Sequence, residues 1–109
     1  MKLVEICVNC PDVETARSIS DVLVEDRLVA CSNIHASIES CYHWKGIVER
    51  ETEVPLLVKT REELFDLCVQ KIKILHPYET PSIIGIAVDL VNQDYLEWIY
   101  AETSSASDE

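Results

Sequence analysis

The sequence contains 109 residues, and its 20 acidic and 9 basic side chains give a formal net charge of −11. A chain of this length suits one domain that buries a core without disulfides, and its 48% hydrophobic content is ordinary for a globular protein. The negative charge argues against nucleic acid and against an anionic membrane as partners, and no apolar run approaches the ~18 residues of a membrane span.

The first half of the chain predicts a strand, a helix and a second strand. Residues 2–9 alternate between apolar and other side chains, which predicts a strand. Pro11 and Asp12 then predict the start of a helix that runs to about residue 26. Residues 30–44 alternate again, so we expect one fifteen-residue strand with mostly apolar even positions and mostly polar odd positions.

The second half predicts a strand, a helix, a strand and a last helix. Residues 45–46 are a turn, and 48–59 return as a partner strand in which Pro55 indicates an edge or a bulge. Thr60 and Glu63 have the spacing of a capping box, which predicts a helix to about residue 75. The nearly continuous apolar run 82–91 is typical of a central strand. Asn92 is then positioned to cap a last helix, residues 93–102.

The resulting order is β-α-β-β-α-β followed by a C-terminal helix. This order is typical of the α+β, ferredoxin-like arrangement, in which two helices cover one face of an antiparallel sheet. We expect one domain over residues 1–103 and a disordered polar tail over residues 104–109.

The predicted hairpin of residues 30–59 is too long for such a domain. A fifteen-residue strand spans about 50 Å, against roughly 3–10 residues for a usual strand. Its far end must project and carry Tyr42, Trp44 and Ile47 with it, and we expect these side chains to contact another subunit. The alternative is a hairpin that bends back onto its own domain.

Five short blocks of sequence carry a resemblance to a known family. They are ACSNI (30–34), YHWKG (42–46), KT (59–60), HPYETP (76–81) and DYLEWI (94–99). In order and spacing they resemble the CutA family of divalent-cation-tolerance proteins, over about residues 3 to 103. The resemblance implies a tight homotrimer packed through the long hairpins and an architecture akin to PII-type signalling proteins. It also implies a role in tolerance of copper and other divalent metals, without catalytic activity.

The HPYETP segment contains the first candidate metal ligands, His76 and Glu79. Pro77 and Pro81 stiffen the backbone on both sides of Glu79, and imidazole and carboxylate groups both bind divalent transition metals. Neighbouring subunits of a trimer would supply the remaining ligands. The alternative is that the segment only joins a helix to a strand, because a histidine at a helix end often contacts the last carbonyls.

Cysteines provide the second candidate site. Cys7 and Cys10 form a C-x-x-C motif between the first strand and the first helix, where small copper-chaperone domains place theirs, and two thiolates suit a soft ion. They converge only if the chain turns at Asn9; otherwise Cys7 is buried and Cys10 is incidental. Four further candidates occupy odd positions of residues 30–44 and therefore share one strand face: Cys31, His35, Cys41 and His43. Cys41 and His43 are close enough to bind Zn²⁺ or Cu²⁺ together, with further ligands from a neighbouring strand or subunit; the alternative is a polar strand face or a trimer interface.

The function predicted from the sequence is a non-enzymatic, trimeric module that binds copper or another divalent ion. Alternatives are a thiol-dependent copper carrier that uses Cys7 and Cys10, and a scaffold for a protein partner that the sequence does not identify. The chain has no nucleophile elbow, phosphate-binding loop or zinc-hydrolase helix. Its start lacks the pattern of a signal peptide, and the odd number of cysteines indicates reduced thiols, so we expect a cytoplasmic protein.

Overall fold

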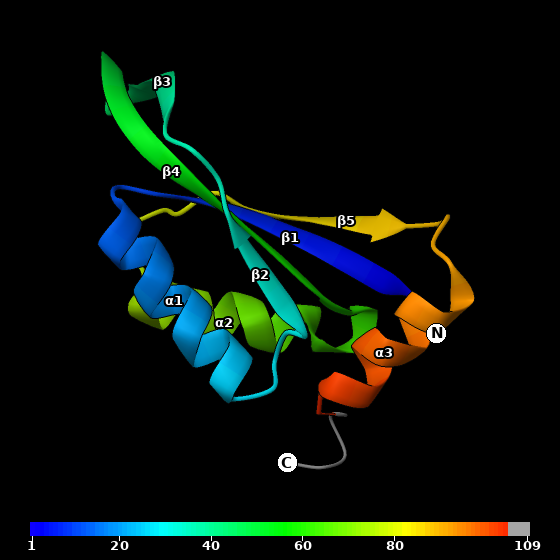
Figure 1. Ribbon diagram of the computed structural model, residues 1–109. Helices are drawn as coiled ribbons and strands as arrows, with labels where there is room; N and C mark the ends of the chain where they lie inside the picture. The colour runs from blue at the N-terminus through cyan, green and yellow to red at the C-terminus, as the bar shows by residue number, and fades with distance from the viewer. Residues whose placement is uncertain (105–109) are drawn as a thin grey trace.

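An antiparallel sheet with helices α1 and α2 on one face dominates the computed structural model, which describes residues 1–104 (Figure 1). The sheet order is β2-β4-β1-β5, and β3 pairs with the far part of β4. The elements are β1 (Leu3–Cys10), α1 (Val13–Glu25), β2 (Cys31–Ile34), β3 (Ile38–Trp44), β4 (Ile47–Arg61), a 3-10 turn (Glu62–Leu64), α2 (Phe65–Leu75), β5 (Ile83–Val88) and α3 (Gln93–Glu102). The predicted fold class is therefore confirmed. The predicted tail lies outside the described residues, except for Ser104.

Alternating apolar residues of β1 and β4 build the core against α1 and α2. Val4, Ile6 and Val8 of β1 are buried, and their neighbours Leu56 and Val58 on β4 are fully buried. Helix α1 contributes Ile19 and Leu23, and α2 contributes Cys68 and Ile72. Each such side chain stabilises the fold by about 1.5–3 kcal/mol relative to an exposed one, so the core holds the helices on this one face.

Helix α1 begins as the sequence predicts. Asp12 is the N-cap residue, and its carboxylate accepts a hydrogen bond of 2.8 Å from the Thr15 amide. This hydrogen bond holds the pKa of Asp12 below its usual value. The cap ends β1 and turns the chain onto the helix face of the sheet.

The predicted capping box at Thr60 and Glu63 does not form. Thr60 belongs to β4, is fully buried, and donates its hydroxyl to the Leu28 carbonyl at 2.6 Å. The chain continues through the 3-10 turn, and α2 begins at Phe65 without a side-chain cap. The prediction was wrong because the Thr60 hydroxyl makes a buried hydrogen bond to Leu28, 32 residues away, and is not available to cap the helix.

The predicted central strand, β5, is an edge strand. It pairs only with β1, and β1 and β4 occupy the centre of the sheet (Figure 1). Its run of apolar residues leaves Ile84 and Ile86 exposed at 59% and 57% on the sheet face opposite α1 and α2. The run was misinterpreted because a strand with two apolar faces was expected to have both of them covered within one chain.

The predicted fifteen-residue strand 30–44 is broken into β2 and β3, and Pro55 explains the break. The His35 amide donates to the Pro55 carbonyl at 2.9 Å. Proline has no N–H to return this bond, so the ladder is interrupted. Pairing stops at Ile34↔Leu56 and resumes at Ile38↔Glu53, with one more residue on the first side than on the second. The bulge or edge that Pro55 indicated is therefore a bulge opposite it.

The extra residue exchanges the two faces of the hairpin. Ser32 lies opposite Val58 on the core face of β4, whereas Tyr42 lies opposite Glu49, on the other parity of the same strand. Cys31 and Cys41 therefore point to opposite sides, and the expectation that they share a face is wrong. A one-residue change of register moves every later side chain to the other face of the sheet.

The hairpin of β3 and β4 projects beyond the sheet, as the sequence predicts (Figure 1). Pairing of β1 with β4 ends at Cys10↔Val54, so residues 47–53 of β4 have β3 on one side only. Lys45 and Gly46 form the turn at its tip, both with positive φ, of 50° and 81°. None of the helices within residues 1–104 is long and apolar enough to cross a membrane.

Candidate functional site

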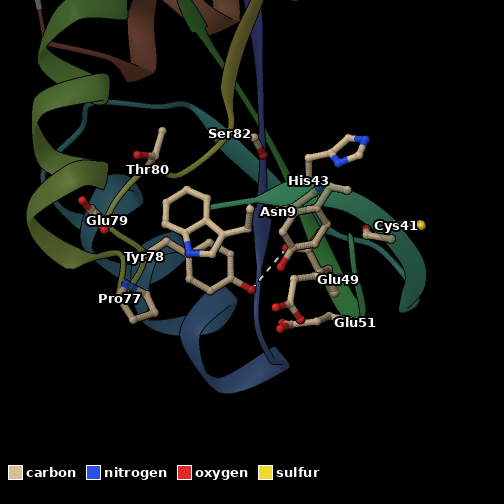
Figure 2. Close-up of a pocket in the computed structure, with 14 residues that line it drawn as sticks. Asn9, Cys41, His43, Glu49, Glu51, Pro77, Tyr78, Glu79, Thr80 and Ser82 are labelled. Carbon is tan, nitrogen blue, oxygen red and sulfur yellow. Dashed lines mark hydrogen bonds between the residues drawn. The ribbon is translucent and has the colours of Figure 1, made fainter. Parts of the chain in front are cut away.

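A pocket of about 700 Å³ lies between the projecting hairpin and the HPYETP segment, and we call it the hairpin pocket (Figure 2). The hairpin contributes two aromatic side chains and three carboxylates, and the segment contributes a tyrosine at the opposite wall. These residues are Tyr42, Trp44, Glu49, Glu51, Glu53 and Tyr78. Because β4 is a continuous strand, the three glutamates alternate onto one of its faces.

Glu53 and Tyr78 form the inner contact of the hairpin pocket. Glu53 is only 6% exposed, and the Tyr78 hydroxyl donates to its Oε2 at 3.2 Å (Figure 2). Burial, followed by the charge and hydrogen bond of Glu53, raises the pKa of Tyr78 far above its ordinary value. The pKa of Tyr42 is raised by desolvation and by the charges of the three glutamates. The field inside the pocket therefore opposes any further negative charge.

Lys45 closes the rim of the hairpin pocket. Its Nζ lies 3.6 Å from Glu79 Oε2 and 5.5 Å from the centre of the Trp44 ring. The tip of the hairpin is thus linked to the HPYETP segment by an ion pair and a cation–π contact. Both side chains of the ion pair are about 70% exposed, so the link is weak and easily exchanged for another partner.

His76 points into the protein and not into the pocket. It is 5% exposed, and its Nε2 lies 2.8 Å from the Asn9 carbonyl oxygen. Its Nδ1 accepts a hydrogen bond of 3.1 Å from the Tyr78 amide, so Nε2 carries the proton that is donated to Asn9. Both ring nitrogens are occupied within the chain. The structure does not bring His76 together with Glu79, whose carboxylate extends to Lys45.

The C-x-x-C motif does not form a two-thiol site. Strand β1 continues through Cys10, so Cys7 and Cys10 lie on opposite faces of the sheet. Cys10 is buried in the core, and burial, with smaller contributions from Asp12 and Glu53, raises its pKa to about 11. Cys7 is only half-buried. The expectation that Cys7 would be the buried cysteine of the pair is therefore wrong, because Cys10 is the buried one.

The remaining cysteines have separate environments. Cys68 of α2 lies in the core, and burial raises its pKa to about 12. Cys31 contacts the Tyr95 hydroxyl at 3.6 Å, whereas Cys41 and His43 extend from β3 away from Tyr78 (Figure 2). Within residues 1–104, no group of three His, Cys, Asp or Glu side chains is positioned to hold a metal ion.

The three glutamates of the hairpin pocket are the feature that the sequence analysis missed. The signal was present as acidic residues at the alternating positions 49, 51 and 53 of one strand, of which Glu49 lies opposite the aromatic Tyr42. It was missed because the faces of residues 30–44 were assigned without the bulge. Of the predicted interface residues, Tyr42 and Trp44 line the pocket, and Ile47 is 62% exposed at the tip.

These features define a class of protein: a ferredoxin-like α+β domain with an elongated hairpin and an acidic, aromatic pocket beneath it. The family model described as "CutA1 divalent ion tolerance protein" matches residues 4–102. The chain therefore belongs to the CutA1 divalent ion tolerance family, as the sequence resemblance implied.

Individual relatives agree with this assignment. The chain is 41% identical over 101 residues to the divalent-cation tolerance protein CutA of Pyrococcus horikoshii, and the match covers 93% of this chain and 98% of that protein. It is 38% identical to human Protein CutA, of which it covers 56%. The crystal structure of CutA from Xylella fastidiosa superimposes with a TM-score of 0.91 at 35% identity, covering 95% of this chain and all of the other.

Proposed function

We propose that this chain acts as a homotrimeric, non-enzymatic module that binds divalent metal ions between its subunits. The observation that carries the proposal is the apolar sheet face opposite α1 and α2. Cys7, Leu57 and Ile84 lie side by side in the strand register, and Ile86 follows on β5. We call these four residues the open sheet face.

The open sheet face is suited to burial against other copies of the chain. Ile84 and Ile86 are more than half exposed, so a monomer would leave this apolar surface in contact with water. The overhanging part of β4 also keeps one free edge, to which a strand from another copy can add. Three copies are proposed because the sequence resemblance implies a trimer that is packed through the long hairpins.

Sedimentation equilibrium tests the assembly. We expect about three times the chain mass of 12.4 kDa for the wild type and a large loss of trimer for Ile86→Asp, because a carboxylate would be desolvated at the interface. Ile74→Asp is the matched control, since Ile74 is 78% exposed on α2, away from the open sheet face. A wild type of monomer mass, or equal dissociation of both variants, would contradict the proposal.

A metal site in this assembly needs ligands from more than one copy, because no three-ligand group exists in the part of one chain that the structure describes. Of the candidate ligands in the HPYETP segment and the C-x-x-C motif, Glu79 has an exposed carboxylate, whereas Cys10 and His76 are buried and Cys7 is half-buried. We therefore propose Glu79 as one ligand for Cu²⁺ or another divalent ion, with oxygen or nitrogen ligands of a neighbouring subunit completing the shell.

Calorimetric titration with Cu²⁺ and Zn²⁺ tests the shared site. We expect saturable binding by the wild type, loss of that binding in the dissociated Ile86→Asp variant, and weaker binding by Glu79→Gln. His76→Ala should bind as the wild type does if the variant still assembles. Full binding by a monomeric variant would place the site within one chain and overturn this part of the proposal.

The five free cysteines support a reducing compartment, and we propose that the protein is cytoplasmic. Fractionation of native cells would test this location.

A further inference from the structure

Helix α3 lacks most of the local features that stabilise a helix. It has ten residues, and isolated helices shorter than about 12–15 residues are marginal in water. Its N-cap residue, Asn92, makes no side-chain capping hydrogen bond, and its last turn contains no basic residue. The helical conformation of α3 therefore depends on contacts with the rest of the chain.

The apolar contact beneath α3 is small. It forms a cluster separate from the core under α1 and α2, and the buried members of this cluster are Leu3, Leu96 and Ile99. Leu3 lies on the same side of β1 as Cys7, so α3 covers one end of the open sheet face, beside the start of β1 (Figure 1). Segments with few buried apolar contacts are the ones that open locally in native proteins.

Arg61, the last residue of β4, binds the carboxyl end of α3. Its Nη2 donates to the carbonyl oxygens of Tyr100 and Thr103, and its Nε donates to Thr103 Oγ1 at 2.8 Å. The same guanidinium lies over the Tyr100 ring, 4.5 Å from the ring centre. Its positive charge also compensates the helix dipole, for which α3 has no basic residue of its own in the last turn. We call this set of contacts the Arg61 clamp.

Other carbonyls at this helix end also have side-chain donors. The last four carbonyls of an α-helix have no partner within the helix. Here Thr103 Oγ1 donates to the Ile99 carbonyl at 2.8 Å, and Arg27 Nη1 donates to the Glu102 carbonyl at 3.2 Å. Arg27 is the weaker of the two arginine contacts, because its side chain is 60% exposed and donates to one backbone oxygen of α3. Arg61 is therefore the principal polar link between α3 and the sheet.

We propose that α3 is a strap that opens as a unit while the rest of the fold stays intact, and that the Arg61 clamp governs how often it opens. Opening would release Leu3 and Val88 from beneath α3 and lengthen the open sheet face by these two residues. The docked helix thus limits the apolar surface that the sheet presents. The inference concerns contacts within one chain and does not rest on the proposed trimer or metal site.

Native-state hydrogen exchange of the whole chain, followed by NMR, tests whether α3 opens separately. We expect the amides of residues 97–102 to exchange as a group and at least about a hundredfold faster than the paired amides of β1, because a local opening is less costly than global unfolding. The exchange of the α3 amides should also depend little on low concentrations of urea, since a local opening exposes little surface.

Arg61→Lys tests the clamp. It keeps the positive charge but removes the forked donor set and the stacking on Tyr100, so the α3 amides should exchange about tenfold faster while those of β1 are unchanged. Arg17→Lys is the matched control, because Arg17 is exposed on α1 and its replacement should change neither group.

Three results would overturn the proposal. The first is equal exchange of α3 and β1 in the wild type, which needs no variant and so applies even if Arg61→Lys does not fold. The second is an Arg61→Lys variant in which the exchange of α3 is unchanged or no faster than in Arg17→Lys. The third is an equal acceleration of α3 and β1 by Arg61→Lys, because the arginine would then stabilise the whole fold and not the strap.

Discussion

His76→Ala is expected to lower the free energy of unfolding by about 2–4 kcal/mol. The ring joins two segments, because Nε2 donates to the Asn9 carbonyl at the end of β1 and Nδ1 accepts a hydrogen bond from the Tyr78 amide in the segment after α2. It also packs edge-on against the Tyr78 ring at 4.7 Å between ring centres. Truncation would leave two backbone groups without partners and a cavity beneath the hairpin pocket. Urea unfolding followed by circular dichroism measures the change.

Glu79→Ala is the matched control for His76 within the same segment. Glu79 is exposed and its ion pair with Lys45 is solvated, so we expect a change of no more than about 0.5 kcal/mol. Equal and small effects of the two substitutions would show that the His76 hydrogen bonds do not hold the segment. That outcome would return His76 to the group of accessible candidate ligands.

Gly85→Val is expected to destabilise the protein by about 3 kcal/mol, the upper end of the usual cost of overpacking. Valine ordinarily favours a strand, so strand propensity alone would predict that Gly85→Val stabilises the protein. The reason is Phe65 at the start of α2, whose ring lies against Gly85 of β5. A Cβ at Gly85 would lie 2.8 Å from Phe65 Cδ1 and still closer to the neighbouring ring atom. Thermal unfolding of the two proteins provides the comparison.

A double-mutant cycle separates this contact from a general effect of glycine. Phe65→Ala removes the ring, so the valine has room and the double variant should lose less stability than the two single changes added together. Strict additivity would show that Gly85 is required for another reason. Its backbone conformation is not that reason, because Gly46 is the glycine with positive φ.

Part of the candidate site could be predicted from the sequence. The HPYETP segment was expected either to join a helix to a strand or to bind metal, and the structure shows the joint in detail through His76. The prolines and the helix end are local signals, so the joint was accessible to local reasoning. The direction of the imidazole ring was not, because its partner Asn9 lies 67 residues away.

Local sequence patterns were sufficient to predict the family, the position of the hairpin and the order of the elements, apart from the break between β2 and β3. Alternation and helical spacing are local consequences of side-chain geometry, and they predicted the presence of β1, α1, β4, α2, β5 and α3. The largest errors are the start of α2, which lies at Phe65, and the end of β5, which lies at Val88. The capped start of α1 at Asp12 and the turn at Lys45 and Gly46 are equally local. These features need no contact with distant parts of the chain.

Which strand faces meet depends on long-range pairing, which local patterns do not contain. The bulge opposite Pro55 adds one residue between β2 and β3, and it turns Tyr42 and Trp44 towards the side of β4 that carries Glu49 and Glu53. The edge position of β5, which exposes Ile84 and Ile86, was likewise set by pairing with β1. Strand register has a period of two, so a single unpaired residue reverses a face without changing the pattern from which the strand was predicted.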